Sequence, residues 1–286
     1  MNRHLSRIAI AATAILAVTA LGGWASPVQP AGKGSDKTVT IYLTRHGQTI
    51  LNTLERVQGW TDSPLIQAGR ALPVTVGQNI RAREGAFDAA YSADMKRHLE
   101  SAQLILQGAG QSSLPVTQLA GLREIDFGRY EGAENKEMWT AIVEHLGYTV
   151  DHAAPAQAPA DATGQNGGWQ TMQAIAATQR GLDALMSAMK AVASEPAENG
   201  AVLPAEDCTD VDARMSADLN EIAQDAAKRN DKRILVVSSG LSISCFLTDS
   251  LHTTVAGGIS NVAVSKLSYT NGTWKVLTVN DKSYQK

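Results

Sequence analysis

The stretch Leu43-Thr44-Arg45-His46-Gly47-Gln48-Thr49 is the most informative part of the sequence, because it continues the short apolar run Val39 to Tyr42. Such a run predicts a buried strand, and this strand would end in an arginine, a histidine and a glycine. Ligands of open α/β sheets bind at the carboxyl ends of strands, so we expect a ligand site here. A guanidinium binds phosphate or carboxylate oxygens, an imidazole can attack or move protons near neutral pH, and a glycine lets an anion approach the backbone.

Four further segments follow in a fixed order, and they are Asn52, Arg56 to Leu65 (RVQGWTDSPL), Tyr91 to Arg97 (YSADMKR) and Leu122 to Gly132 (LREIDFGRYEG). Together with the Arg-His-Gly motif, this set resembles the histidine phosphatase superfamily, which includes phosphoglycerate mutases and many acid and broad-specificity phosphatases. The resemblance covers most of residues 39–140 and resumes at 233–281. It implies a three-layer α/β/α sandwich with a mostly parallel mixed sheet, and phosphoryl transfer that needs no metal and no cofactor.

The resemblance also implies a role for each motif residue. His46 would be the nucleophile that takes the phosphoryl group on a ring nitrogen, and Arg45 and Arg97 would bind the phosphate. Glu124 would be the general acid, if burial and the phosphate charge raise its pKa. Donors from Asn52 and Gln58 complete the expected phosphate-binding set.

Each of these residues also has a purely structural interpretation. His46 could be a core histidine, Arg97 a solvated arginine at a helix start, and Glu124 the partner of Arg123 on the surface. Asp126, Glu131 and Glu134 remain alternative acids. The spacing around His98 indicates a position on a helix surface, without a role in the site.

One position departs from the family pattern. After the apolar run Ile234 to Val237, the family has Ser-His-Gly, whereas this chain has Ser238-Ser239-Gly240. A serine hydroxyl can donate one hydrogen bond but carries no charge. Losing one preorganised donor costs about a hundred- to a thousand-fold in rate, so turnover is in doubt, although Ser239 and Gly240 remain candidates for phosphate binding.

The other elements follow from hydrophobic spacing. We expect strands at 87–91, 115–119 and 234–237, helices at 96–106 and 240–251, and a hairpin of 263–269 and 274–279 around Asn271-Gly272. Residues 64–83 look helical, but Pro73 argues against one continuous helix. An insertion of about 140–230 would form a helical cap, with a loop at 150–170, helices at 171–193 and 211–229, and a linker around 195–207.

The N-terminus predicts a secretory signal peptide over residues 1–25, with Arg3 and Arg7 before the uncharged apolar stretch Ile8 to Leu21. A flexible lead-in of 26–37 and one domain of 38–286 would follow. We therefore expect an exported protein, periplasmic or secreted, that contacts a membrane only through an uncleaved leader. Removal of the leader changes the formal net charge from −3 to −5, which gives no support for nucleic-acid binding.

The two cysteines, Cys208 and Cys245, could pair in an oxidising compartment, but Cys245 also fits a free core position within an apolar run. The spacing of His, Cys, Asp and Glu does not form a metal-binding signature.

The leading expectation is a phosphomonoesterase that acts on phosphorylated small molecules through a phosphohistidine at His46. A catalytically degenerate protein that binds phosphate esters or anions is the alternative from another class. A phosphoglycerate-type mutase is less favoured, because export would separate the protein from cytosolic intermediates.

Overall fold

The computed structural model describes residues 37–148, 179–255 and 257–286. The predicted signal peptide, nearly all of the lead-in, the predicted loop at 150–170 and the first part of the helix expected from 171 lie outside the described residues. None of the described helices is long and apolar enough to cross a membrane.

A six-stranded mixed sheet forms the centre of the fold, in the order β3-β2-β4-β1-β5-β6. Its strands are β1 (Val39–Arg45), β2 (Ala89–Ser92), β3 (Val116–Gln118), β4 (Arg233–Ser238), β5 (Val264–Thr270) and β6 (Thr273–Asp281). The first four run parallel to one another, and β5 and β6 add an antiparallel hairpin beside β1. This confirms the predicted fold class, with its parallel centre and terminal hairpin.

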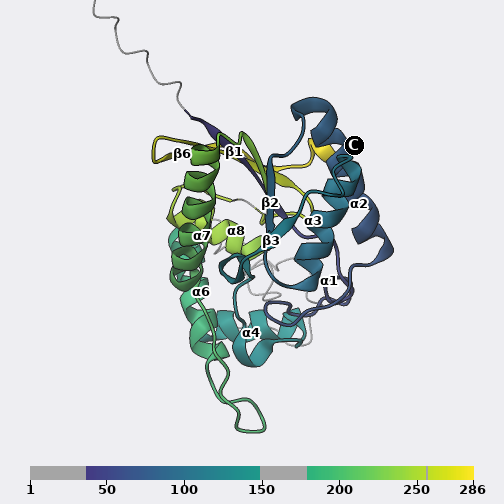
Figure 1. Ribbon diagram of the computed structural model, residues 1–286. Coiled ribbons are helices and arrows are strands. Elements are labelled where there is room, and N and C mark those ends of the chain that lie inside the picture. The colour runs from purple at the N-terminus through teal and green to yellow at the C-terminus, as the bar shows by residue number, and fades with distance from the viewer. Residues whose placement is uncertain (1–36, 149–178, 256) are drawn as a thin grey trace, which may run out of the picture. The chain divides into compact units, whose positions relative to one another are not determined.

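Helices cover both faces of this sheet (Figure 1). On one face, α2 (Gln67–Glu84) and α3 (Lys96–Gly108) pack on Tyr42, Leu235 and Val237. On the other face, α7 (Cys208–Arg229) and α8 (Gly240–Asp249) pack on the alternate side chains, such as Ile41 and Val236. The central strands are buried on both faces, as their nearly unbroken apolar runs require.

The remaining described helices lie beside this sandwich or at its edges. The short α1 (Ile50–Thr53) follows β1, α4 (Asn135–His145) and α6 (Gln179–Ala193) pack against each other, and three 3-10 turns cover Ala120–Leu122, Gly128–Tyr130 and Ser283–Gln285. The helix expected from 211 begins earlier, at Cys208. Asp207 forms a capping box with Asp210 there, a signal that apolar spacing alone does not contain.

The doubt about a continuous helix at Pro73 was wrong, because α2 runs unbroken from Gln67 to Glu84 with Pro73 inside it. A proline cannot donate to the carbonyl four residues earlier, which here belongs to Gly69. That carbonyl faces the backbone of Gly47 instead, where an added Cβ would lie only 2.2 Å from the Gly69 oxygen. Two glycines thus let the start of α2 approach the end of β1 closely.

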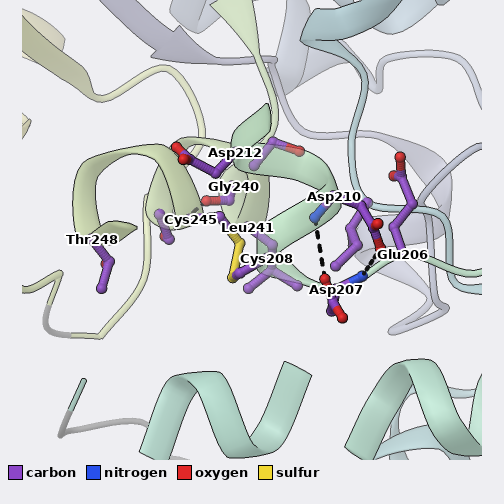
Figure 2. Close-up of a disulfide and its surroundings, with 12 residues drawn as sticks. Glu206, Asp207, Cys208, Asp210, Asp212, Gly240, Leu241, Cys245 and Thr248 are labelled. Carbon is purple, nitrogen blue, oxygen red and sulfur yellow. Dashed lines mark hydrogen bonds between the residues drawn. A yellow bond between two sulfur atoms is a disulfide. The ribbon is translucent and has the colours of Figure 1, made fainter. Parts of the chain in front are cut away.

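The question of cysteine pairing is also answered. Cys208, at the start of α7, and Cys245, within α8, form a disulfide (Figure 2). Both side chains are buried, so Cys245 is a core residue and a bridge at once. The bridge ties the two helices on one face of the sheet together.

Candidate active site

Three neighbouring parallel strands bring the predicted site residues to one edge of the sheet. Arg45 lies opposite Ser238 in the β1–β4 register, and the His46 N–H donates to the Ser238 carbonyl at 3.0 Å. On the other side of β4, the chain leaves β2 and starts α3, which carries Arg97. Residues far apart in the sequence therefore meet at the carboxyl ends of the strands, as the fold class predicts.

The environment of His46 fixes its tautomer and its charge. Its ring Nδ1 lies 2.8 Å from the Gly47 carbonyl, which can only accept, so Nδ1 carries the hydrogen and Nε2 the lone pair. The side chain is buried, and burial together with the charges of Arg97 and Arg45 lowers the pKa of His46 well below its usual value. His46 is therefore a neutral imidazole with a nucleophilic Nε2 at neutral pH.

Two guanidinium groups, those of Arg97 and Arg45, lie near the His46 ring. Arg97 is fully buried, and it donates to the Gly59 and Thr61 carbonyls and to Asp62, with an Arg97 Nη1 to Asp62 Oδ1 distance of 2.9 Å. Arg45 donates through Nη1 to the Ile259 carbonyl at 2.9 Å. The Nε atoms of both arginines are buried without a partner among the described residues, so each retains a donor for an anion. The interpretation of Arg97 as a solvated arginine is wrong.

The loop between α8 and β5 supports the end of β1, and no motif indicated this role. Besides the Ile259 carbonyl, Asn261 donates to the His46 carbonyl at 2.9 Å, and the Val262 N–H donates to the Arg45 carbonyl at 3.0 Å. Val262 has a φ of 57°, which a β-branched residue adopts only under strain. The strained Val262 backbone is thus part of the loop that holds Arg45 and His46 in place.

Asn52 and Gln58 lie next to each other after β1. The Asn52 amide donates to Gln58 Oε1 at 3.3 Å, and Asn52 Oδ1 accepts from the Thr49 N–H in the capping box that starts α1. Gln58 is buried and also donates to Ser63. These contacts give both residues a structural part in the loop, and the described contacts do not join either one to His46 directly.

Glu124 is held at the amino end of α8. Its Oε1 accepts from the Ile125 N–H, the Ser242 N–H and the Ser242 hydroxyl at 2.9–3.0 Å, whereas among the described residues Oε2 accepts from the Leu241 N–H alone, at 3.2 Å. The Glu124 charge acts on both Arg45 and Arg97, so the carboxyl group belongs to the same cluster. Oε2 is the oxygen with capacity left to carry a proton.

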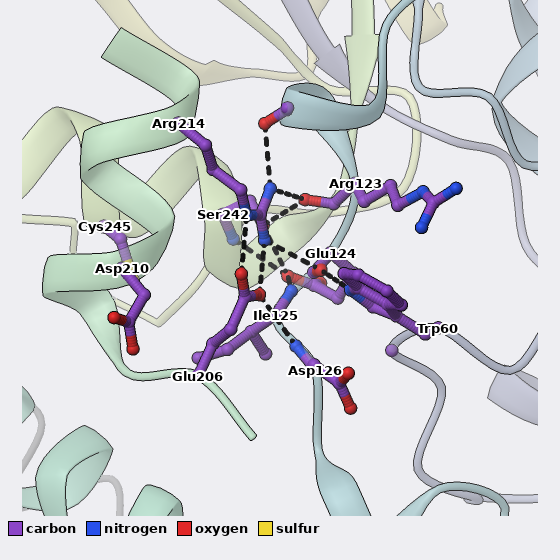
Figure 3. Close-up of polar contacts among 12 residues, drawn as sticks. Trp60, Arg123, Glu124, Ile125, Asp126, Glu206, Asp210, Arg214, Ser242 and Cys245 are labelled. Atoms are coloured by element: carbon purple, nitrogen blue, oxygen red, sulfur yellow. Dashed lines mark hydrogen bonds and ion pairs between the residues drawn. The ribbon is translucent and has the colours of Figure 1, made fainter. Parts of the chain in front are cut away.

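The interpretation of Glu124 as a partner of Arg123 is wrong, because Arg123 pairs with Asp94 at 2.6 Å. The main chain around Glu124 is instead held by Arg214 of α7 (Figure 3). Arg214 donates to the carbonyls of Gly121, Arg123 and Glu124 at 2.7–3.0 Å and pairs with Glu206. No motif predicted the role of this arginine, because it lies in a helix without a recognised motif.

Ser239 and Gly240 form the start of α8. Gly240 lies beside the Arg45 side chain, since an added Cβ would make ordinary van der Waals contact with the Arg45 Cδ and Nε atoms at 3.4 Å. Ser239 is fully buried, and its hydroxyl lies 2.6 Å from Nε2 of His98. The expectation that His98 lies on a helix surface was wrong, because His98 is fully buried and its ring meets the His46 ring edge-on, with the centroids 5.0 Å apart.

Within the described residues, no group of three or more His, Cys, Asp and Glu side chains is arranged to hold a metal ion. The described side chains form a cationic cluster around a neutral imidazole, with a carboxyl group in the same cluster. Its charges suit a bound anion, and phosphoryl transfer depends on this kind of positioning and charge neutralisation.

Comparison with known proteins agrees with this geometry. The model of the histidine phosphatase superfamily (branch 1) matches residues 41–168 and 164–282, so the chain belongs to this superfamily. The protein is 31% identical to a phosphoglycerate mutase from Bacillus anthracis, with a TM-score of 0.69 over 87% of this chain and 96% of that chain. A mycobacterial glucosyl-3-phosphoglycerate phosphatase shares the fold, at 22% identity and a TM-score of 0.54 over 85% of this chain and 99% of that chain.

Among curated relatives, a 2,3-bisphosphoglycerate-dependent phosphoglycerate mutase of Bartonella quintana is 37% identical over 35% of this chain and 48% of its own length. A broad-specificity phosphatase of Saccharomyces cerevisiae is 31% identical over 35% of this chain and 43% of its own length. The chain spans about half the length of the curated relatives it matches. Its superfamily therefore includes both mutases and phosphatases.

Proposed function

We propose that the protein is a phosphomonoesterase that hydrolyses small phosphate esters through a phosphohistidine on His46. The observation that carries this proposal is the neutral His46 beside two guanidinium groups, each with a buried Nε that has no partner among the described residues. Such a site offers a nucleophile and two forks for the oxygens of a phosphoryl group.

In the first step, the Nε2 lone pair of His46 attacks phosphorus, and the bond between phosphorus and the ester oxygen breaks. Arg45 and Arg97 bind the phosphoryl oxygens, and Glu124 gives its proton to the leaving oxygen. The Nδ1–H of His46 stays on the Gly47 carbonyl, which keeps the ring oriented throughout.

In the second step, a water molecule attacks the phosphohistidine. Glu124, now a carboxylate, takes a proton from this water, and the bond between nitrogen and phosphorus breaks. Inorganic phosphate leaves, and His46 and Glu124 return to their initial states.

A metal-free assay on p-nitrophenyl phosphate tests this mechanism. We expect the unchanged chain to turn over and His46→Ala to lose activity by at least a thousand-fold, whereas His145→Ala, a matched change of an exposed histidine, keeps it. Glu124→Gln should lose more activity on an alkyl phosphate than on p-nitrophenyl phosphate, because p-nitrophenolate leaves without a proton. Activity that persists in His46→Ala would rule out the phosphohistidine.

The same assay separates the other candidate functions. A degenerate anion-binding protein would show no turnover but would bind phosphate, and Ser239 is the residue that favours this alternative. A mutase, suggested by the names of several relatives, would interconvert phosphoglycerates in the presence of a bisphosphoglycerate faster than it hydrolyses them.

We further propose that the protein is exported and works in the periplasm or outside the cell. The apolar stretch after Arg3 and Arg7 motivates this proposal, and the Cys208–Cys245 disulfide suits an oxidising compartment. Mass spectrometry of the exported protein should find an N-terminus near residue 26, and an intact Met1 would contradict cleavage.

A further inference from the structure

The candidate site contains a second imidazole, His98, to which no motif assigns a role. We propose that His98 is a positioning residue that fixes the Ser239 hydroxyl as a hydrogen-bond donor to the phosphoryl group. The His98–Ser239 pair would then supply the donor that a histidine at position 239 is expected to supply in this superfamily. This inference rests on the proposed phosphoryl transfer at His46.

The geometry puts the pair beside the nucleophile. Ser239 follows Ser238, whose carbonyl accepts from the His46 N–H at 3.0 Å, and His98 follows Arg97 in α3. Both members of the pair are fully buried, and Nε2 of His98 lies 2.6 Å from Oγ of Ser239. The His98 ring also meets the His46 ring edge-on, with the centroids 5.0 Å apart.

The partners of the two ring nitrogens decide which one carries the hydrogen. Nδ1 of His98 is buried without a partner among the described residues. An unpaired buried N–H is rarer than an under-satisfied acceptor, so the hydrogen belongs on Nε2, where it is donated to Ser239. Burial and the neighbouring Arg97, His46 and Arg45 lower the pKa of His98 well below its usual value, so the ring is neutral and has only this one N–H.

The consequence concerns the hydrogen of the Ser239 hydroxyl. A hydroxyl group has one hydrogen and two lone pairs, and one lone pair accepts from His98. Ser239 also makes no side-chain capping bond at the start of α8. Among the described residues, its hydrogen therefore has no capping partner and can be donated to an oxygen of a phosphoryl group bound by Arg45 and Arg97.

The opposite arrangement would make Ser239 a nucleophile. In that case Nε2 of His98 would accept the Ser239 hydrogen, as in a serine–histidine pair, and the Nδ1–H would be left buried and unpaired. The two arrangements differ in the tautomer of His98, which can be measured without any turnover.

The first test is the ¹⁵N NMR spectrum of the full chain with labelled histidine, with His98 assigned by its loss in His98→Gln. We expect a neutral ring with the hydrogen on Nε2 at pH 7, and a shift of the Nε2 signal in Ser239→Ala. An Nδ1–H tautomer, a charged ring or an unchanged signal in Ser239→Ala would overturn the proposal. Because this spectrum does not depend on catalysis, it stays informative if the phosphatase proposal fails.

The second test is a double-mutant cycle with p-nitrophenyl phosphate. Ser239→Ala and His98→Ala should each lower kcat at least tenfold, with KM changed less than threefold. The double variant should be no more than threefold worse than Ser239→Ala, because His98 acts through Ser239. The proposal would be overturned if the losses of the two single variants multiply in the double variant, or if His98→Ala has no effect on kcat.

His98→Gln is the conservative control, because its amide N–H can still donate to Ser239. His98→Gln should retain at least a third of the activity that is lost in His98→Ala. A His98→Gln variant as inactive as His98→Ala would contradict the positioning role. If the unchanged chain shows no turnover, the affinity of each variant for orthovanadate is measured by calorimetry instead. We expect the affinities to change among the variants in the same pattern as kcat.

A third test exchanges the two positions. Because His98 and Ser239 are buried in contact, an imidazole at position 239 has no room while His98 is present. We expect Ser239→His alone to be at least tenfold less active than the double variant His98→Ala with Ser239→His. Equal activity of the two would show that the side chains do not share one space.

Discussion

Among individual side chains, the buried His46 and His98 make the stability of the fold depend on pH. Both are neutral in the folded chain, because burial and nearby arginines lower their pKa values well below about 6.5, the value in an unfolded chain. As the pH falls below about 6.5, the unfolded chain binds protons that the folded chain does not. The free energy of unfolding therefore falls with pH, by up to about 1.4 kcal/mol per pH unit for each histidine.

Protonation of Asp249 has the opposite effect on the free energy of unfolding over part of this pH range. Burial and the charges of Asp183 and Asp212 raise its pKa to about 6, so the folded chain holds a proton that the unfolded chain loses above about pH 4. Asp249 is present in both the unchanged chain and His98→Gln, so its contribution cancels when the two proteins are compared. Urea unfolding at several pH values between 6 and 5 gives the change in the free energy of unfolding per pH unit. This change should be smaller for His98→Gln than for the unchanged chain, by about 1.4 kcal/mol per pH unit. An equal change in the two proteins would contradict a buried neutral His98.

The residue motifs identified part of the site and missed its support. Arg45, His46, Arg97 and Glu124 meet as expected, because each lies at a strand end or helix start that the sequence marks. His98 was misplaced because helical spacing alone does not tell which neighbouring strand end faces it. Arg214 and the loop of Ile259 to Val262 act through backbone carbonyls, and contacts of that kind leave no residue pattern.

Among the helices and loops, α7 determines where Glu124 lies. Arg214→Ala removes the donors to the Gly121, Arg123 and Glu124 carbonyls, so the loop that carries Glu124 should shift. If Glu124 is the proposed acid, we expect kcat to fall at least tenfold, because displacing a reacting group by about 1 Å can cost about a hundred-fold. Arg229→Ala, on the same helix but paired with Asp231 at its end, should leave kcat unchanged. An Arg214→Ala variant with full activity would show that this support is unnecessary.

The disulfide joins α7 to α8 across 37 residues of sequence. A loop of this length predicts a loss of about 3–4 kcal/mol in the free energy of unfolding when the bridge is removed. Guanidinium unfolding of the unchanged chain with and without reductant measures this loss. Cys208→Ala with Cys245→Ala should be equally destabilised and insensitive to reductant. Equal stability with and without reductant would contradict the bridge.

Most elements were predictable because each has a local signal. The apolar runs at 39–42 and 234–237 and the Asn271-Gly272 turn define β1, β4 and the β5–β6 hairpin. The start of α7 at Cys208 and the continuity of α2 through Pro73 were not predictable, since capping by Asp207 and the approach of Gly47 to Gly69 depend on partners that spacing does not show.

For the protein as a whole, attraction of an anionic substrate must be local. The formal net charge is −3, yet Arg45 and Arg97 gather at one edge of the sheet around the neutral His46. A cationic cluster within an acidic protein concentrates anions only over short distances, because salt screens charges beyond about 8–10 Å. The parallel order β2-β4-β1 is what places both arginines at that edge.

If His46 accepts the phosphoryl group, as proposed, the phosphohistidine can be trapped during turnover. The chain is mixed with p-nitrophenyl phosphate for milliseconds, quenched in alkali, in which phosphohistidine survives, and sequenced by mass spectrometry. We predict one phosphoryl group on His46, and none in His46→Ala. A phosphoryl group on Ser239, or turnover without any phosphorylated His46, would contradict the claim.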